Sequence, residues 1–125
     1  MEWTLTIKQT AGEYELTVSA AAVGSDILLL LQGGDNPHIG CAVQAIPRKS
    51  LSGDGSMSAT SSVLNLVGHK DEFLCRQLAE TVASRTNAVV VCTGGFHVDD
   101  IRQAVIGQLS ETVEIIADEI IKKLV

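Results

Sequence analysis

"ILLLLQ", residues 27–32, is a nearly continuous apolar run that follows "GSD" at 24–26 and ends in the loop "GGDNPHIG" at 33–40. A strand with one buried face alternates apolar and polar residues, whereas a continuous apolar run is typical of a strand covered on both faces. We therefore predict that residues 27–32 form the central strand of a sheet. The loop that follows is unusual, because a tight turn needs only Gly with Asn or Asp, yet this one also contains His38.

Alternating stretches flank this central strand. Residues 3–7, "WTLTI", and the positions from Tyr14 to Ala22 alternate apolar with polar side chains on either side of the turn "TAGE". This pattern predicts two half-buried antiparallel strands. After the histidine loop, "IGCAVQAI" at 39–46 predicts a fourth strand.

The polar passage "PRKSLSGDGSMSATSS" at 47–62 fits either a disordered lid or a long hairpin. Its centre, "SGDGS", contains the Asp-Gly signal of a tight hairpin and lies between Leu51 and Met57. We favour the hairpin, which leads into a fifth strand, "SSVLNLV", at 61–67.

From Asp71 the apolar period changes to that of a helix, which ends near "SRTN" at 84–87. Its apolar face contains Leu74, Leu78 and Val82. "AVVVCT" at 88–93 predicts a short buried strand, and a last helix runs from about Asp99 towards the C-terminus. Asp100 and Gln103 have the spacing of a capping box at the start of that helix.

These elements predict a single α+β domain over residues 1–125. A mostly antiparallel five-strand meander comes first, followed by helix, strand and helix, with the helices packed on the sheet. We expect the sixth strand to lie parallel to the fifth, joined to it by a right-handed crossover through the first helix.

The last helix has a wide apolar stripe. Its main positions run from Ile101 to Leu124, and three more isoleucines widen it: Ile106, Ile115 and Ile121. A stripe of this width predicts a homo-oligomer in which part of the C-terminal helix contacts another subunit. On this hypothesis, charged residues in place of Ile116 and Ile120 break the oligomer.

Composition narrows the function classes. The chain has 125 residues, a net charge of −6 and only 3% aromatic residues. Its basic residues form no stripe, so nucleic acid is not an expected partner. No apolar stretch approaches the roughly 20 residues that span a bilayer, and the N-terminus lacks a signal-peptide pattern. We expect a soluble, cytoplasmic protein without a membrane partner.

The three cysteines, Cys41, Cys75 and Cys92, are widely and unevenly spaced. This spacing argues against a disulfide framework and a zinc knuckle, and we interpret these residues as small buried hydrophobes. No Ser lies in a Gly-x-Ser-x-Gly elbow, which argues against a nucleophilic enzyme.

Each of the three histidines, His38, His69 and His97, follows a Gly-containing turn after a predicted strand. In a meander the first, third and fifth strands end at one edge of the sheet, and a sixth strand parallel to the fifth ends there too. All three histidines, with the turn "QTAGE" at 9–13, should therefore lie along one edge. Two helix N-termini at that edge favour an anion such as a phosphate.

Simpler roles stay open for each histidine. His69 and His97 also fit helix caps, and His38 fits a turn-closing residue. Gly33, Gly34, Gly94 and Gly95 fit turns that need positive φ, or a close approach of ligand to backbone. A metal site from the imidazoles with Asp71 or Asp99 has suitable chemistry. We do not expect a metal, because no compact motif such as His-Glu-x-x-His is present.

The three loops that contain the histidines resemble the corresponding segments of a known family. In order, "GGDNPHIG", "GHKDE" before a helix and "GFHVDD" before the last helix resemble the LpdD-like prenylated-flavin chaperone family, small bacterial and archaeal proteins. That family is named after the small D component associated with gallate decarboxylase. The resemblance covers most of the domain in layout, while its specific part is these three segments; the double glycine Gly94–Gly95 is a departure.

The resemblance implies a non-catalytic accessory protein that binds or helps mature prenylated FMN for a partner decarboxylase of aromatic acids. By position it implicates the following residues: Asp35, Pro37, His38, His69, Lys70, Asp71, His97 and Asp99. In such a crevice Lys70 and the helix N-termini would hold the flavin phosphate. The ring system would contact the histidines, Asn36 and the apolar residues Ile39, Phe96 and Val98.

Two alternatives remain beside this hypothesis. The protein could be a small metal-dependent or acid–base enzyme that uses the loop histidines, since imidazole titrates near neutral pH. It could instead be a pure subunit-assembly module that binds through its last helix.

Overall fold

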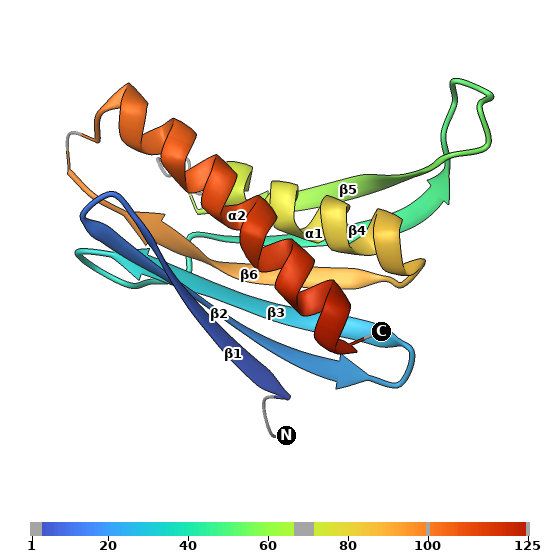
Figure 1. Ribbon diagram of the computed structural model, residues 1–125, viewed down its shortest axis with the longest axis horizontal. Coiled ribbons are helices and arrows are strands. Elements are labelled where there is room, and N and C mark those ends of the chain that lie inside the picture. Colours follow the sequence, from blue (N-terminus) through green and yellow to red (C-terminus); the bar gives the residue numbers. More distant parts are fainter. Residues whose placement is uncertain (1–3, 67–71, 100, 125) are drawn as a thin grey trace.

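The computed structural model describes residues 4–66, 72–99 and 101–124. Six strands form one sheet, and two helices lie on one of its faces (Figure 1). The strands are β1 (Leu5–Ala11), β2 (Tyr14–Val23), β3 (Asp26–Gly34), β4 (Cys41–Lys49), β5 (Met57–Asn65) and β6 (Val90–His97). The helices are α1 (Glu72–Thr86) and α2 (Gln103–Leu124). The α+β class is therefore confirmed.

The strand order differs from the predicted meander. The sheet runs β1-β2-β3-β6-β4-β5, so β6 is inserted between β3 and β4. The parallel pair is β3 with β6, and the predicted neighbours β5 and β6 are separated by β4. Residues 35–40 carry the chain across β6, a distance of about 10 Å or two strand spacings. Because β6 lies between β3 and β4, both of its edges are hydrogen-bonded to a neighbouring strand. Its first residues are apolar.

The strand directions agree with the prediction even though the neighbours do not. β1 is antiparallel to β2, β2 to β3, and β4 to both β5 and β6. Because β6 is parallel to β3, the strands β1, β3, β5 and β6 all point the same way. Their carboxyl ends lie at one edge of the sheet.

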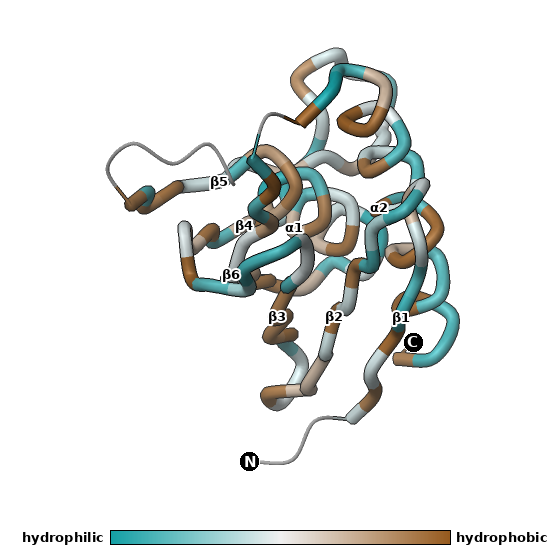
Figure 2. The backbone as a smooth tube through the Cα atoms, turned by 90° about the vertical axis from the view of Figure 1, so that its left-hand side faces the viewer, coloured by the Kyte–Doolittle hydropathy of each residue, from teal (hydrophilic) through white to brown (hydrophobic). Residues whose placement is uncertain are grey.

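The hydrophobic core lies between the sheet and the two helices. Alternate residues of the central strands point into it and are fully buried, among them Leu29, Leu31, Val43 and Val90. All three cysteines are buried, as predicted. Figure 2 shows both helices over the same face of the curved sheet. The expectation that residues 27–32 are covered on both faces is therefore wrong for a single copy, and Leu28 and Leu30 stay partly exposed.

Residues 47–62 form the predicted hairpin and not a lid. β4 pairs with β5 from Cys41 opposite Asn65 to Lys49 opposite Met57. The fifth strand thus begins at Met57, earlier than predicted. In the turn, the Asp54 carboxylate accepts hydrogen bonds from the backbone N–H and the hydroxyl of Ser56, and these bonds lower the pKa of Asp54.

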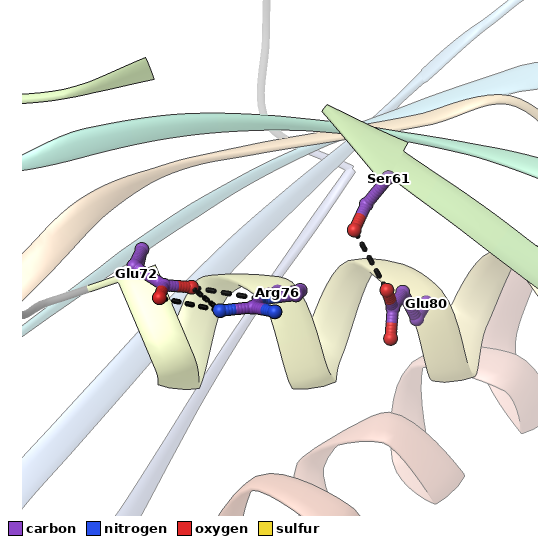
Figure 3. A network of polar contacts seen from close by, with 4 residues as sticks. All are labelled: Ser61, Glu72, Arg76 and Glu80. Atoms are coloured by element: carbon purple, nitrogen blue, oxygen red, sulfur yellow. Dashed lines mark hydrogen bonds and ion pairs between the residues drawn. The ribbon is translucent and has the colours of Figure 1, made fainter. Parts of the chain in front are cut away.

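Polar contacts attach α1 to the sheet and stabilise its first turns (Figure 3). The Ser61 hydroxyl on β5 donates to the Glu80 carboxylate at 2.7 Å. One turn from the start of the helix, Arg76 pairs with Glu72. That pairing raises the pKa of Arg76.

Helix α2 begins later than predicted. Its first helical residue is Gln103, and the N–H groups of Val105 and Ile106 donate to the Arg102 carbonyl. The predicted capping box is wrong in this register, because it would make Gln103 the third helical residue; Asp100 itself lies outside the described residues. Ile101 packs against the core before the helix starts.

Most residues of the apolar stripe of α2 are buried in the hydrophobic core of this copy. Ile116 and Ile120 are fully buried, whereas Ile115 is 51% exposed. The prediction that Ile116 and Ile120 form a subunit interface is therefore wrong. Within the described part of the chain, neither helix is long and apolar enough to cross a membrane.

Candidate functional site

The ends of β3 and β6 bring two of the predicted loops together. The strands are parallel and in register, with Gly34 beside His97. Just beyond this pair, the Asp35 N–H donates to the His97 carbonyl at 2.8 Å. On the other side of β6, the Gly40 N–H donates to the Gly94 carbonyl at 2.9 Å. The loop from Asp35 to Gly40 is therefore tied at both ends to β6.

His38 and His97 are in contact at this edge. Their ring centroids are 5.8 Å apart and the ring planes are nearly perpendicular, at 87°. His38 Nδ1 donates to the Asn36 carbonyl at 3.1 Å, and His97 Nε2 lies 3.0 Å from the Asp99 carboxylate. Each imidazole is thus oriented by an oxygen acceptor within its own loop, which defines the orientation of both rings.

Most of the predicted loop residues are accessible. Asp35, Asn36 and Asp99 are exposed, and His38 and His97 are partly exposed. His69, Lys70 and Asp71 lie outside the described residues, so the structure does not place them. The prediction of a common edge is confirmed for His38 and His97 and stays a prediction for His69.

Phe96 occupies a different position from the one predicted. It belongs to β6 and not to a loop, and it is only 8% exposed. Its ring contacts Tyr14 edge to face, with centroids 5.8 Å apart. Because neighbouring residues of a strand point to opposite faces, Phe96 faces the helices while His97 faces away from them.

Two glycines allow the backbones to approach each other here. Gly34 has φ +80° and Gly94 has φ +125°. A Cβ atom at Gly34 would overlap the His97 carbonyl, and one at Gly94 would overlap the Leu31 carbonyl. The close contact between β3 and β6 therefore requires a residue without a side chain at these two positions.

Tyr14 and Arg102 also belong to this edge, and the sequence analysis missed both. Burial raises the pKa of Tyr14, and a hydrogen bond with Glu13 and the negative charges of Glu13 and Asp35 raise it further, while Arg102 lowers it. The Tyr14 ring contacts Phe96, the neighbour of His97 in β6, and Arg102 lies between the end of β6 and the start of α2. The predicted position of the turn "QTAGE" at this edge was the only signal that pointed to Tyr14.

The edge therefore combines imidazoles, exposed carboxylates, an amide, a phenol and a guanidinium. These groups offer hydrogen-bond donors and acceptors together with one cation. No group of three or more His, Cys, Asp or Glu side chains suited to a metal occurs in residues 4–66, 72–99 and 101–124.

Comparison with known proteins identifies the family. The model of the prenylated flavin chaperone LpdD-like domain matches residues 10–125. The chain belongs to this family. One relative, protein LpdD of Lactiplantibacillus plantarum, is 27% identical to this LpdD-like chain over 117 residues. The match covers 89% of this chain and 78% of the relative.

A solved structure shares the fold of this LpdD-like chain. It is a chain from the crystal structure of a chaperone complex for yeast 20S proteasome assembly. The TM-score is 0.58 with 17% identity, and the match covers 97% of this chain and 98% of that chain. At this identity the similarity is one of fold alone.

Proposed function

We propose that this protein is a non-catalytic chaperone that binds prenylated FMN, or helps it mature, for a partner decarboxylase of aromatic acids. The family assignment supports the chaperone role. The single observation that carries the location of the site is the contact between His38 and His97, which lie in two separate segments of the predicted loops.

The chemistry of the edge supports a flavin phosphate ligand. Flavin rings need hydrogen-bonding partners, which His38, His97 and Asn36 supply. The phosphate needs a cation and free N–H groups. Arg102 directly precedes the first residue of α2, where unpaired N–H groups and the helix dipole favour an anion. Arg102 thus joins the basic residue predicted from sequence, Lys70, as a phosphate contact.

The binding of the cofactor is tested by anaerobic titration of the purified protein with FMN and with prenylated FMN, followed by flavin absorbance and fluorescence. Saturable binding of prenylated FMN is expected for the natural chain. His38→Ala and His97→Ala should each weaken it, and Arg102→Ala should weaken FMN more than a flavin without phosphate.

A matched control comes from aspartate positions at the two edges of the sheet. Asp35→Asn changes the proposed site, whereas Asp54→Asn changes the hairpin turn at the opposite edge. Only the first should alter flavin binding. Absence of binding by the natural chain, or equal weakening by Asp54→Asn in a folded protein, would contradict the proposal.

One observation favours a second function, a small acid–base enzyme. His97 Nε2 contacts the Asp99 carboxylate at 3.0 Å, and a carboxylate that orients an imidazole is a common feature of general bases. This hypothesis predicts turnover of an aromatic acid or flavin precursor that Asp99→Asn abolishes. Binding of flavin without any chemical change, in the natural chain and in Asp99→Asn alike, would favour the chaperone.

A further inference from the structure

Strand β5 forms one edge of the sheet, and within the described residues it pairs with β4 alone (Figure 1). Its nine residues, "MSATSSVLN", include no charged residue and no proline. Edge strands of natural proteins usually carry a charge, a proline or a bulge that keeps another strand from pairing with them. The sequence of β5 therefore lacks the usual protection of an edge.

Alternate residues of β5 direct their backbone groups away from β4. At the two ends of the pair, the Leu66 N–H donates to the Gly40 carbonyl and the Ser50 N–H donates to the Ser56 carbonyl, both at 2.8 Å. Opposed residues of an antiparallel pair are alternately hydrogen-bonded and not hydrogen-bonded, so the even positions of β5 bond to β4. The N–H and C=O groups of the odd positions point to the free edge. We call these positions the outward residues: Met57, Ala59, Ser61, Val63 and Asn65.

The neighbouring strand β4 is protected where it leaves β6. The pairing of β4 with β6 ends at Ala45 opposite Val90. Pro47 is the next residue of β4 whose backbone is directed to that side, because it lies opposite the outward residue Ala59. A proline has no N–H to leave unpaired, and it hinders the addition of a strand. The hairpin thus has a proline on one free edge and none along β5.

The opposite edge of the sheet, formed by β1, is also protected. Lys8 lies within β1 and pairs with Glu15 at 3.6 Å. The Gln9 amide donates to the Glu119 carboxylate of α2 at 2.7 Å. Charged side chains and a covering helix are two of the ways in which proteins block an edge strand. Of the two edges, β5 is therefore the one open to another strand.

A carboxylate lies beside the centre of the β5 edge. Ser61 is the middle one of the outward residues, and its hydroxyl donates to Glu80 Oε1 at 2.7 Å (Figure 3). Among the described residues, none donates a hydrogen bond to Glu80 Oε2. Opposed side chains on neighbouring strands lie about 5 Å apart. A lysine or arginine opposite Ser61 on an added strand can therefore reach the Glu80 carboxylate.

We propose that β5 takes up an extended basic segment of a partner protein as a seventh strand of the sheet, with a lysine or arginine opposite Ser61. Such addition supplies backbone hydrogen bonds to the outward residues, and the side chains of the segment supply specificity. Charge favours a basic segment, because the chain has a net charge of −6 and the side chain next to this edge is Glu80. The partner is the decarboxylase, and this naming alone rests on the proposed function.

Charge disfavours a second copy of the chain as the added strand. Two β5 strands paired antiparallel and centred on Ser61 would place the Glu80 carboxylates of both copies on the same side of the joined sheet, close to each other. Like charges at opposed positions of neighbouring strands are destabilising. A basic segment instead brings a cation to this place.

The seventh strand lies close to the histidine edge. Leu66 directly follows β5, and its N–H donates to the carbonyl of Gly40, two residues after His38. One end of a segment bound along β5 is therefore beside the loop that contains His38. A partner held there is positioned to receive the cofactor from this edge.

The experiment measures, by biolayer interferometry, how tightly the full chain binds an aromatic-acid decarboxylase from the same organism, purified without its cofactor. Ala59→Pro removes one outward N–H and leaves the hydrogen bonds to β4 in place. We expect its dissociation constant to rise about tenfold or more, because a ladder hydrogen bond is lost and the ring obstructs the added strand. Circular dichroism and solution mass should match the natural chain.

The role of charge is tested by a matched pair of variants. Glu80→Gln and Glu111→Gln each remove one negative charge from a helix, and Glu111 is exposed on α2. Glutamine at position 80 keeps an oxygen that accepts from Ser61. Glu80→Gln should raise the dissociation constant about twofold to fivefold, the range for one partly exposed ion pair. Glu111→Gln should leave it unchanged.

Hydrogen exchange, measured residue by residue by NMR, locates the contact. The amides of Ala59, Ser61 and Val63 should exchange rapidly in the free chain and slowly in the complex. The amides of Ser62 and Leu64, which bond to β4, should be protected in both. Outward amides that are already protected in the free chain, or that stay unprotected in the complex, overturn the proposal.

The binding data can also overturn it, in three ways: no binding by the natural chain, undiminished binding by a folded Ala59→Pro, or equal effects of the two glutamine variants. If Ala59→Pro does not fold, Asn65→Pro takes its place, since Asn65 is an exposed outward residue at the end of β5. A chain that binds prenylated FMN but no decarboxylase contradicts the seventh strand alone. A chain that binds the decarboxylase but no flavin contradicts the proposed function alone.

Discussion

The imidazole of His97, the last residue of β6, lies edge to face against the imidazole of His38, in the loop after β3. This contact exists because β6 is parallel to β3 and hydrogen-bonded to it. Had β6 paired with β5 as predicted, both β4 and β5 would lie between the two rings. The position of one strand in the sheet thus determines the composition of the candidate site.

The two histidines should act together in ligand binding. We expect the loss of flavin affinity in the double variant His38→Ala/His97→Ala to differ from the sum of the single losses by about 0.5–3 kcal/mol, because contacting residues are coupled. Titration of all four proteins with prenylated FMN measures this coupling. As a control, the pair His97→Ala and Asp54→Asn should be additive, since Asp54 lies at the opposite edge. Additive histidine effects would argue that the two rings do not contact one ligand.

Gly94 should be among the most sensitive positions of the chain. Gly94→Ala places a Cβ atom onto the Leu31 carbonyl in a backbone conformation with φ +125°, so we expect a loss of more than about 4 kcal/mol in the free energy of unfolding. Gly24→Ala is the matched control, because Gly24 has φ +61° and no atom within 4 Å of the added Cβ. That variant should lose only about 1–2 kcal/mol. Urea denaturation measures both, and similar losses would contradict the close approach of β3 and β6.

Two neighbouring isoleucines of α2 should differ sharply in their effect on stability. Ile116 is fully buried and Ile115 is 51% exposed. Ile116→Ala should therefore lower the free energy of unfolding by about 2–5 kcal/mol, whereas Ile115→Ala should change it by less than about 0.5 kcal/mol. Urea denaturation followed by circular dichroism measures the difference. Equal losses would mean that another subunit buries Ile115.

The sequence pattern predicted the strands, the helices and the strand directions better than it predicted which strands lie side by side in the sheet. Alternation and turn signals located all six strands and both helices, and strand parity correctly placed the ends of β3 and β6 at one edge. The periodicity of apolar residues within a strand shows which of its faces is buried. It does not show which other strand forms hydrogen bonds with its edges. The loop at residues 35–40 is long enough either to turn back or to cross β6, so its length did not decide between them.

The candidate site was predictable where residues follow a strand end and not where they meet through tertiary packing. His38 and His97 come directly after or at the end of apolar strands, which made their edge predictable. Tyr14 reaches this edge only because β2 pairs with β3, and Arg102 only because it directly precedes α2, which starts at Gln103. The run at 27–32 predicted a strand covered on both faces, but the helices cover only one face, and Leu28 and Leu30 stay partly exposed.

Tyr14 reports on the electrostatics of the site, because it is the only tyrosine of the chain. Its pKa is raised from 10.0, first by burial and then by Glu13 and Asp35, while Arg102 opposes the shift. Ultraviolet absorbance of tyrosinate follows this titration directly. Asp35→Asn should lower the pKa of Tyr14 and Arg102→Ala should raise it, whereas Asp54→Asn should leave it unchanged.

The same shift makes stability depend on pH in a defined direction. A phenol whose pKa is higher in the folded state binds its proton more tightly there than in the unfolded chain. Its contribution to stability is therefore complete below pH 10.0 and is lost as the pH rises through the folded pKa. Tyr14→Phe should remove this part of the alkaline loss, which urea denaturation at neutral and alkaline pH measures against the natural chain. An identical alkaline loss in Tyr14→Phe would mean that other groups, and not Tyr14, cause it.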